Sequence, residues 1–140
     1  AADTGRGLVV PVVRDTNNKS IVQIADEIFE KATLAREGQL PPEDMRGGTF
    51  TITNVGPLGG TALLPTINYP EVAILGMGRG RLQPAVIDKG NGEPEIAPRL
   101  IMPIVLCIDH RVLDGADAIQ FLKTVIEALE DPDELLISMI

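Results

Sequence analysis

One stretch of the chain, CIDHRVLDGADA at residues 107–118, gathers side chains that could do chemistry. It contains His110, the only histidine among 140 residues, between Asp109 and Arg111 and four residues before Asp114. Because the ordinary pKa of imidazole lies near neutrality, a histidine held in a cleft can take a proton from a substrate and return it. The plainer reading is a structural loop, in which Asp114 caps the next helix and Asp109 pairs with Arg111.

A strand and a helix must position this loop. Residues 99–108, RLIMPIVLCI, are a continuous apolar run that we expect to form one strand buried on both faces. The next helix is predicted to begin near Asp114 and to end at EDPD, and DELLISMI predicts a short final helix. The apolar stripe of the helix that begins near Asp114 comprises Ala118, Leu122, Val125, Ile126 and Leu129. A histidine between such elements projects from a rigid support.

The earlier part of the chain mixes the same kinds of element. Residues 7–13, 49–55 and 71–78 predict strands, GPLGG predicts a turn, and DKGNGEPE predicts a hairpin-like loop. Ser20 is expected to cap a helix that runs to about Arg36. Its predicted buried face comprises Ile21, Ile24, Ala25, Ile28, Ala32 and Ala35. The order indicates one α/β or α+β domain.

Composition argues against several classes of function. Twenty acidic and twelve basic residues give a net charge of -8, which opposes general binding to nucleic acid or an anionic membrane. No apolar run approaches the roughly 20 residues that cross a bilayer. Cys107 is the only cysteine, so we expect a small core residue, no disulfide within the chain and a reducing compartment. One histidine and one cysteine cannot furnish an ordinary zinc site, and we expect no metal.

Several motifs together carry a family resemblance. DHRVLDGADA resembles the DHRxxxDG signature of the dihydrolipoamide acyltransferases, the E2 cores of the 2-oxo acid dehydrogenase complexes. DTGRGLVVPVVRD, GGTFTITNVG, GGTALLPTINYPEVAILGMG and PRLIMPIVLCIDHRVLDGADA resemble that family in its order. The resemblance implies a chloramphenicol-acetyltransferase-like two-layer α/β sandwich. That catalytic domain is longer at its N-terminus, so residues 1–140 resemble its C-terminal portion, and we expect Ala1 to be a cut end and the lipoyl domain to be absent.

The resemblance also assigns roles to residues. The family moves an acyl group between the thiols of dihydrolipoamide and coenzyme A, and His110 matches its general base. Thr53 matches a position where a hydroxyl stabilises the oxyanion, although residue type alone favours an ordinary strand threonine. Asp114 matches a residue that supports the loop. Arg79 and Arg81 are candidates for the phosphates of coenzyme A.

Assembly follows from the same resemblance. Family members form homotrimers in which His110 would act beside Thr53 of a neighbouring chain, and trimers build cubic or dodecahedral cores. LLISMI resembles the tail used in those contacts. The E1 and E3 enzymes would bind through domains absent from this chain, in a bacterial cytoplasm or a mitochondrial matrix. No nucleic-acid or membrane partner is expected.

Two other functions stay open. One is an inactive core or scaffold subunit that binds partner enzymes, and the other is a free-standing acetyltransferase of the chloramphenicol type. The segments GGTFTITNVG and INYPEVAILGMG resemble the E2 proteins more than they resemble the free-standing acetyltransferases. DGADA resembles acetyl and branched-chain acyltransferases more than succinyl ones, so we expect an acetyl group.

Overall fold

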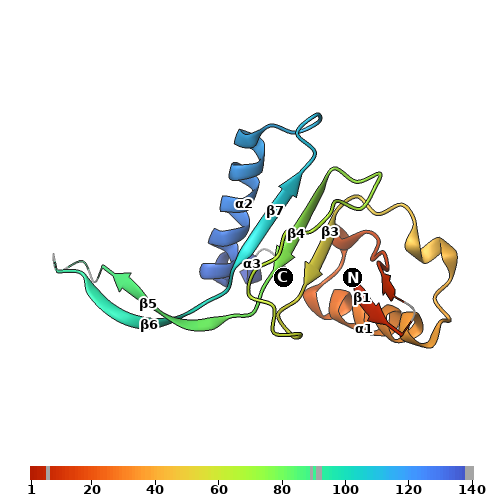
Figure 1. Ribbon diagram of the computed structural model, residues 1–140, viewed down its shortest axis with the longest axis horizontal. Helices are drawn as coiled ribbons and strands as arrows, with labels where there is room; N and C mark the ends of the chain where they lie inside the picture. The colour runs from red at the N-terminus through yellow and green to blue at the C-terminus, as the bar shows by residue number, and fades with distance from the viewer. Residues whose placement is uncertain (6, 89, 91–92, 138–140) are drawn as a thin grey trace.

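The computed structural model describes the chain apart from residues 6, 89, 91–92 and 138–140. It has the mixed α/β character that the sequence predicts, and the described strands form three sheets (Figure 1). In chain order the elements are β1 (Ala2–Thr4), β2 (Gly7–Val9), the 3-10 helix η1 (Thr16–Asn18), α1 (Ile21–Glu37), the 3-10 helix η2 (Pro42–Met45), β3 (Thr51–Asn54), β4 (Ala73–Met77), β5 (Arg81–Ile87), β6 (Glu95–Ile101), β7 (Ile104–Ile108), α2 (Gly115–Glu130) and α3 (Asp133–Ile137).

A three-stranded sheet in the order β3-β4-β7 forms the centre of the molecule. Strand β3 runs parallel to β4, and β7 runs antiparallel to it. Ala73, Ile74 and Leu75 of the central strand are buried, as expected for a short apolar run flanked by partners on both sides. The sheet therefore supplies most of the buried core.

Helix α2 packs against the sheet through β7. It begins after Asp114, as predicted, and ends at Glu130 before Pro132. The ring of Phe121 lies 5.4 Å from the ring of Phe50, which directly precedes β3, so the helix spans the sheet from one edge strand to the other. This packing fixes the helix that follows the His110 loop.

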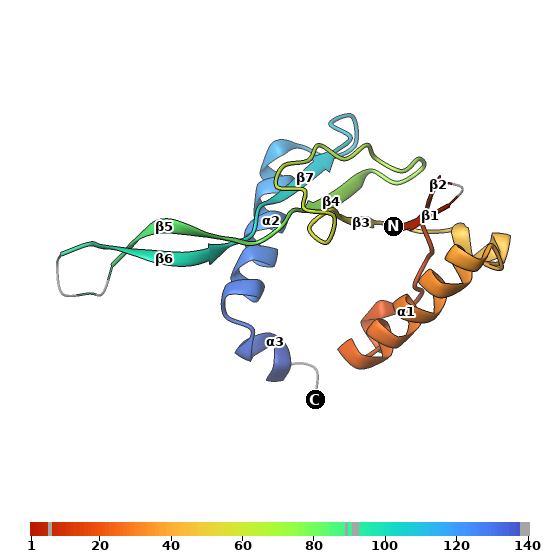
Figure 2. The same ribbon diagram turned by 60° about the horizontal axis from the view of Figure 1, so that its bottom comes forward.

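The N-terminal elements form a second group beside β3 (Figure 2). Helix α1 begins with a capping box, in which Ser20 accepts from the amide of Gln23 and the Gln23 side chain accepts from the amide of Ser20. It ends at Gly38, whose φ of 71° suits glycine. Lys31 of α1 forms a 2.9 Å ion pair with Asp44 of η2.

The predicted buried face of α1 is correct for three of its six residues and wrong for the other three. Of the residues assigned to it, Ala35 is buried and Ile24 and Ala32 are half-buried, whereas Ile21, Ala25 and Ile28 are exposed. The physical reason is that the helix packs against β1 and η2 on a different side, and no described element covers these apolar positions. Its periodicity predicted the helix correctly but not what lies against each face.

Residues 99–108 are two strands rather than one. The run leaves β6 at Ile101, breaks at Met102 and Pro103, and enters β7 in a different sheet. Strand β6 is mostly exposed and β7 is half-buried, so the predicted burial on both faces is also wrong. Pro103 cannot donate a ladder hydrogen bond, while its carbonyl accepts from Gly78 at the turn back to the sheet.

Strands β5 and β6 form an antiparallel hairpin, as predicted, and residues 89 and 91–92 of the predicted loop DKGNGEPE lie outside the described residues. Strands β5 and β6 pair along their whole length and project from the body as an arm, residues 81–101 (Figures 1 and 2). Near the N-terminus, only residues 7–9 of the predicted strand at 7–13 are extended in a ladder, and they pair with the unpredicted β1. The last helix, α3, is confirmed, and residues 138–140 of the predicted tail lie outside the described residues.

Candidate functional site

His110 lies on a tight turn directly after the edge strand β7. The amide of Asp109 donates to the carbonyl of Val72 at 2.8 Å, which extends the ladder between β4 and β7 by one residue. The amides of Val112 and Leu113 then donate to the carbonyl of Asp109 at 3.0 and 3.1 Å and close the turn. His110 is exposed, and no described residue of the chain hydrogen-bonds to its imidazole. The imidazole of His110 therefore projects from a hydrogen-bonded turn and is accessible to a substrate.

Asp109 and Arg111 brace this turn from either side of the histidine. The guanidinium of Arg111 donates from Nε to Oδ1 at 2.8 Å and from Nη2 to Oδ2 at 2.5 Å. The amide of Arg111 also donates to Oδ1 at 3.1 Å. These bonds to the Arg111 side chain and amide lower the pKa of Asp109 from 3.8 to about 2. The predicted pair between the two residues is confirmed.

Asp114 occupies the N-cap of α2. Its Oδ1 accepts from the amides of Ala116 at 2.8 Å and Asp117 at 3.0 Å, so two otherwise unpaired donors of the first helical turn are satisfied. The predicted cap is confirmed. Since the carboxylate is committed to helix amides, it fixes where the loop ends and the helix begins.

Thr53 is half-buried on β3, where it pairs with Gly76 of β4. A Cβ placed on Gly76 would lie 2.7 Å from Leu63 Cδ1 and 3.0 Å from Val105 Cγ1, so both side chains cover that face of the glycine. Directly paired residues project to the same face of a sheet. Thr53 therefore projects from the face of the sheet on which Leu63 and Val105 cover Gly76.

The structure does not bring Thr53 and His110 together within one chain. Thr53 is level with Gly76, whereas Asp109 is level with Val72, four residues away on the same strand. Four residues of strand span about 13 Å. The two predicted site residues therefore lie toward opposite ends of the sheet.

Arg79 and Arg81 follow the end of β4 that is nearer to Thr53. The amide of Arg79 donates to the carbonyl of Gly60 at 2.7 Å, and the amide of Val55 donates to the carbonyl of Met77 at 3.0 Å. These bonds hold the GPLGG turn against the end of β4. Arg79 is exposed beside this turn, and Arg81 is exposed at the first position of β5.

Glu71 is a supporting residue that the sequence analysis missed. Thr51, the buried polar residue at the start of β3, donates from its hydroxyl to Glu71 Oε2 at 2.6 Å, and Asn68 donates to Oε1 at 3.3 Å. Glu71 precedes Val72, whose carbonyl receives the amide of Asp109. The carboxylate thus anchors the segment to which the His110 turn is attached. A charged residue two positions before a buried strand was the available signal.

Three further observations concern metal ligands, the cysteine and membrane-spanning helices. Among the residues that the structure describes, no group of three or more His, Cys, Asp or Glu side chains could hold a metal ion. Cys107 is half-buried on β7, opposite Ile74. None of the helices in the described ranges has the length and apolar character needed to cross a membrane.

The fold and the site together define an α/β domain that presents a histidine on a braced turn between an edge strand and a capped helix. The chain belongs to the family described as 2-oxoacid dehydrogenases acyltransferase (catalytic domain), whose model matches residues 1–137. Both the fold class and the resemblance inferred from the sequence are thereby confirmed.

Individual relatives agree with this assignment. The chain is 46% identical over 131 residues to the dihydrolipoyllysine-residue acetyltransferase component of the pyruvate dehydrogenase complex of Haemophilus influenzae, covering 94% of this chain and 22% of that protein. It also resembles two solved structures, each with a TM-score of 0.88 and 43% identity, covering 97% of this chain and 54% of theirs. One is the cubic core of the pyruvate dehydrogenase multienzyme complex.

The other is the Azotobacter vinelandii dihydrolipoamide acetyltransferase, studied for the role of a serine, a histidine and an asparagine in its catalytic mechanism. In that enzyme the histidine and asparagine are four positions apart, the spacing of His110 and Asp114 here. The present chain spans about a fifth of the length of the curated relative and about half of the solved chains.

Proposed function

We propose that the protein is an acyltransferase that moves an acetyl group between dihydrolipoamide and coenzyme A. The observation that carries the proposal is the exposed His110 on a turn braced by Asp109 and Arg111, in a chain of the acyltransferase family. The acetyl group is supported by the acetyltransferase names of relatives that are 43–46% identical.

His110 is the proposed general base. A thiol with an ordinary pKa of about 8.5 is mostly protonated at neutral pH, and the thiolate is the nucleophile. The imidazole takes the proton of the attacking thiol as its sulfur bonds to the thioester carbonyl carbon. When the tetrahedral intermediate collapses, the bond to the departing sulfur breaks and that sulfur receives the proton from the imidazolium. The same steps run in either direction.

Thr53 is the proposed hydrogen-bond donor to the oxyanion of that intermediate. A preorganised donor of this kind contributes about 2.7 to 4 kcal/mol to transition-state stabilisation. Because Thr53 and His110 are separated along the sheet by about 13 Å in one chain, we propose that each site pairs His110 of one copy with Thr53 of a neighbouring copy. Asp114 keeps its supporting role, since its carboxylate fixes the end of the loop.

Self-assembly is therefore part of the proposal. We propose a homotrimer that builds a larger cubic or dodecahedral core, supported by the similarity to a relative that forms a cubic core. Arg79 and Arg81 are the proposed contacts for coenzyme A phosphates. The lipoyl group and the binding of the E1 and E3 enzymes are assigned to domains outside residues 1–140, in a bacterial cytoplasm or a mitochondrial matrix.

A core or scaffold subunit without activity is the second candidate. It is favoured by the separation of Thr53 and His110 within the chain and by the large apolar side chains left exposed on α1 and the arm. Exposed apolar surface of this kind fits a role in assembly, whether or not the protein is catalytically active.

The test is acetyl transfer from acetyl-coenzyme A to free dihydrolipoamide, with the mass of the assembly measured in the same sample. We expect turnover in the chain and at least a hundredfold loss in His110→Ala with an unchanged mass. Near-normal turnover in that variant would refute the general-base assignment. If the chain assembles but shows no acetyl transfer, the result would favour the scaffold function over the acyltransferase.

A further inference from the structure

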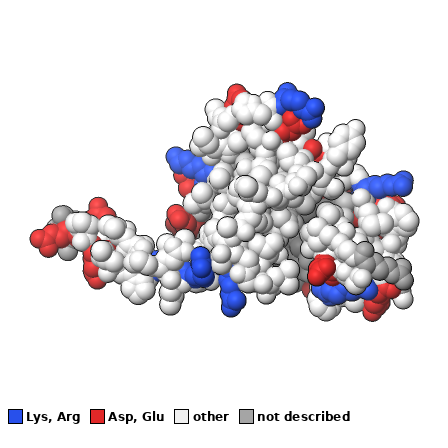
Figure 3. All heavy atoms as spheres, viewed as in Figure 1, with Lys and Arg blue, Asp and Glu red and all other residues white. Residues whose placement is uncertain are grey.

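The His110 turn is attached to the central sheet through the backbone of Val72. The amide of Asp109 donates to the carbonyl of Val72 at 2.8 Å, at the end of the ladder between β4 and β7. The brace between Asp109 and Arg111 lies within the turn itself, at the end of β7 where Figure 3 shows acidic and basic atoms together. The position of His110 relative to the sheet therefore depends on where Val72 lies.

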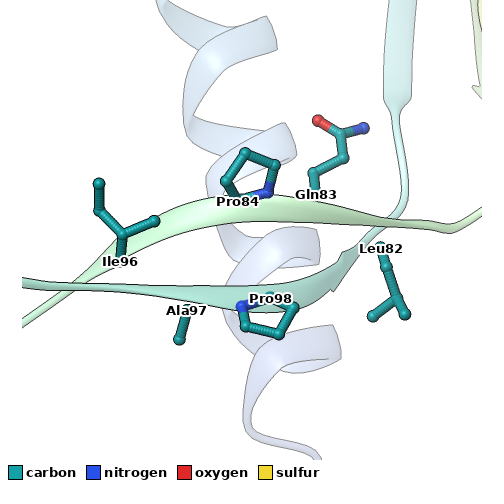
Figure 4. Close-up of a pocket in the computed structure, with 6 residues that line it drawn as sticks. All are labelled: Leu82, Gln83, Pro84, Ile96, Ala97 and Pro98. Carbon is teal, nitrogen blue, oxygen red and sulfur yellow. The ribbon is translucent and has the colours of Figure 1, made fainter.

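Two hollows lie on other parts of the described surface. One of about 290 Å³ is formed on the arm by residues 82–84 and 96–98 (Figure 4), and one of about 410 Å³ lies between α1 and Asp44. Neither hollow is lined by a residue of the His110 turn. The imidazole is therefore placed by the backbone that carries it rather than by either hollow.

A turn at residues 68–71 fixes where Val72 lies. The amide of Glu71 donates to the carbonyl of Asn68 at 2.9 Å, and the side-chain amide of Asn68 donates to Glu71 Oε1 at 3.3 Å. The same two residues thus close the turn twice, once through the backbone and once through their side chains. Since Val72 follows directly, this turn sets the orientation of its carbonyl.

The carboxylate of Glu71 also binds β3. The buried Thr51 donates from its hydroxyl to Glu71 Oε2 at 2.6 Å. A hydrogen bond to an ionised acceptor is stronger than one between neutral groups. The ladder between β3 and β4 begins at Thr51 and Ile74, so Val72 lies beyond the part of the chain that β3 pairs with. The carboxylate therefore connects this segment to β3 where the ladder does not.

Gly48 leaves the space that the carboxylate occupies. A Cβ placed on this glycine would lie 2.7 Å from Glu71 Oε1 and 3.4 Å from Val12 Cγ2. The first distance is shorter than a van der Waals contact, so a side chain at residue 48 would displace the carboxylate from its two donors. Residues 48–51 and 68–71 therefore form a binding site for a carboxylate that belongs to the chain itself.

We propose that Glu71 is a positioning residue for His110. Its carboxylate holds the turn at residues 68–71 against β3, and that turn places the carbonyl to which the His110 turn is bonded. A base removes a proton from a thiol efficiently only when the reacting atoms are held about 3–3.5 Å apart, and a misplacement of about 1 Å costs up to roughly a hundredfold in rate. The role rests on His110 as the proposed general base and names the carboxylate that places it.

A positioning role differs measurably from a role in stability alone. Because His110 serves both thiols, loss of the carboxylate should lower kcat in both directions of transfer and leave the KM for each substrate little changed. A carboxylate that only stabilised the fold would change the free energy of unfolding and leave kcat per folded chain unaltered. The two roles are separated at a temperature where every variant is folded.

The experiment compares variants of the full chain in acetyl transfer between acetyl-coenzyme A and free dihydrolipoamide. Glu71→Ala removes the carboxylate, and Gly48→Ala displaces it without altering Glu71. Glu71→Gln keeps one acceptor oxygen, and its amide can donate to the hydroxyl oxygen of Thr51. Glu27→Ala is the matched control, since it removes another half-buried carboxylate, which is paired with two lysines. Circular dichroism and the mass of the assembly are measured on each variant.

We expect kcat to fall at least about tenfold in Glu71→Ala and about threefold in Gly48→Ala, and to stay within about twofold in Glu71→Gln and Glu27→Ala. Thr51→Val removes one of the two bonds and leaves the carboxylate bonded to Asn68, so most of the turnover should remain.

A double variant tests whether Glu71 acts through His110. In a His110→Ala background, Glu71→Ala should cause no further loss of the residual transfer. A normal kcat in Glu71→Ala, an equal loss in Glu27→Ala, or a further tenfold loss in the His110→Ala background would overturn the proposal.

A spectroscopic measurement separates this inference from the proposed function. His110 is the only histidine of the chain, so ring-labelled histidine gives a carbon-13 spectrum that reports on this residue alone. We expect its resonances to shift in Glu71→Ala and Gly48→Ala and to stay unchanged in Glu27→Ala. Shifted resonances in a protein whose transfer survives His110→Ala support the positioning and contradict the general base. Unchanged resonances in a protein that loses transfer only in His110→Ala support the general base and contradict the positioning.

Discussion

Thr53 and His110 lie toward opposite ends of one sheet, because Thr53 pairs with Gly76 while the residue before His110 bonds to Val72. Strand β4 between them is paired with β3 from Ile74 to Met77 and with β7 from Ala73 to Met77, so a shift that joined the two residues would break the sheet. A shared site therefore requires two chains, and this requirement can be tested without a structure of the assembly.

Inactive variants should complement each other. His110→Ala copies lack the base and Thr53→Val copies lack the oxyanion donor, and each homogeneous preparation should lose at least a hundredfold in acetyl transfer. When the two are mixed and reassembled, some interfaces combine His110 from one copy with Thr53 from another. We expect the mixture to regain a fraction of the turnover, measured under conditions that allow subunits to exchange.

The control is each variant reassembled alone, which should stay inactive. A mixture that remains as inactive as its parts, despite demonstrated exchange of subunits, would contradict a site built between chains.

The role of the Thr53 hydroxyl should be visible in kcat. Thr53→Val removes the hydroxyl and keeps the shape, so we expect kcat to fall by roughly 10² to 10³ with little change in KM for coenzyme A. Thr51→Val is the matched control on the same strand. It removes a buried hydrogen bond to Glu71, so it should lower the free energy of unfolding by about 1–3 kcal/mol while retaining most turnover. A change confined to KM in Thr53→Val would remove it from the oxyanion role.

Local signals in the sequence predicted the helices well. Ser20 and Asp114 each cap the helix that was expected after them, because a cap depends on residues within one turn. The strand centred on residues 73–77 was recognised from its apolar run for a similarly local reason.

Long-range features were not predictable in the same way. Residues 99–108 form one apolar run, but Pro103 divides it between two sheets, and only the pairing of β6 with β5 explains why. Ile21 and Ile28 have the spacing of a buried face and remain exposed, since hydrophobic period does not specify what packs against a helix. The distance between Thr53 and His110 likewise depends on strand register, which the motifs do not encode.

Asp114 should act through its cap. Asp114→Ala leaves the amides of Ala116 and Asp117 without their acceptor, so we expect the free energy of unfolding to fall by about 1 kcal/mol. Asp114→Asn keeps an equally good cap and should retain both stability and transfer. Denaturant unfolding and turnover measured on both variants check this. Full loss of transfer in Asp114→Asn would show that the charge matters beyond the cap.

Arg79 should contribute to coenzyme A affinity if it contacts the phosphates. Arg79→Gln removes the charge beside the GPLGG turn, and we expect a several-fold rise in KM for coenzyme A with a small change in kcat. Arg99→Gln on the arm is the charge-matched control and should leave that KM unchanged. Equal effects of both substitutions would indicate a general change in net charge rather than a contact.

The pH dependence of the His110 turn follows from the ion pair between Asp109 and Arg111. The folded-state pKa of Asp109 is about 2, below its ordinary value of 3.8, so the pair stabilises the fold fully above about pH 4. That contribution declines as the pH falls from about 4 toward 2 and the carboxylate takes up a proton. We expect a carboxyl resonance of Asp109 to titrate near pH 2 in the native protein, and near pH 3.8 in Arg111→Gln. Replacement of Lys123, whose ion pair with Glu127 lies on exposed α2, should leave the Asp109 titration unchanged. A value near 3.8 in the unaltered protein would show that the pair does not hold the turn in solution.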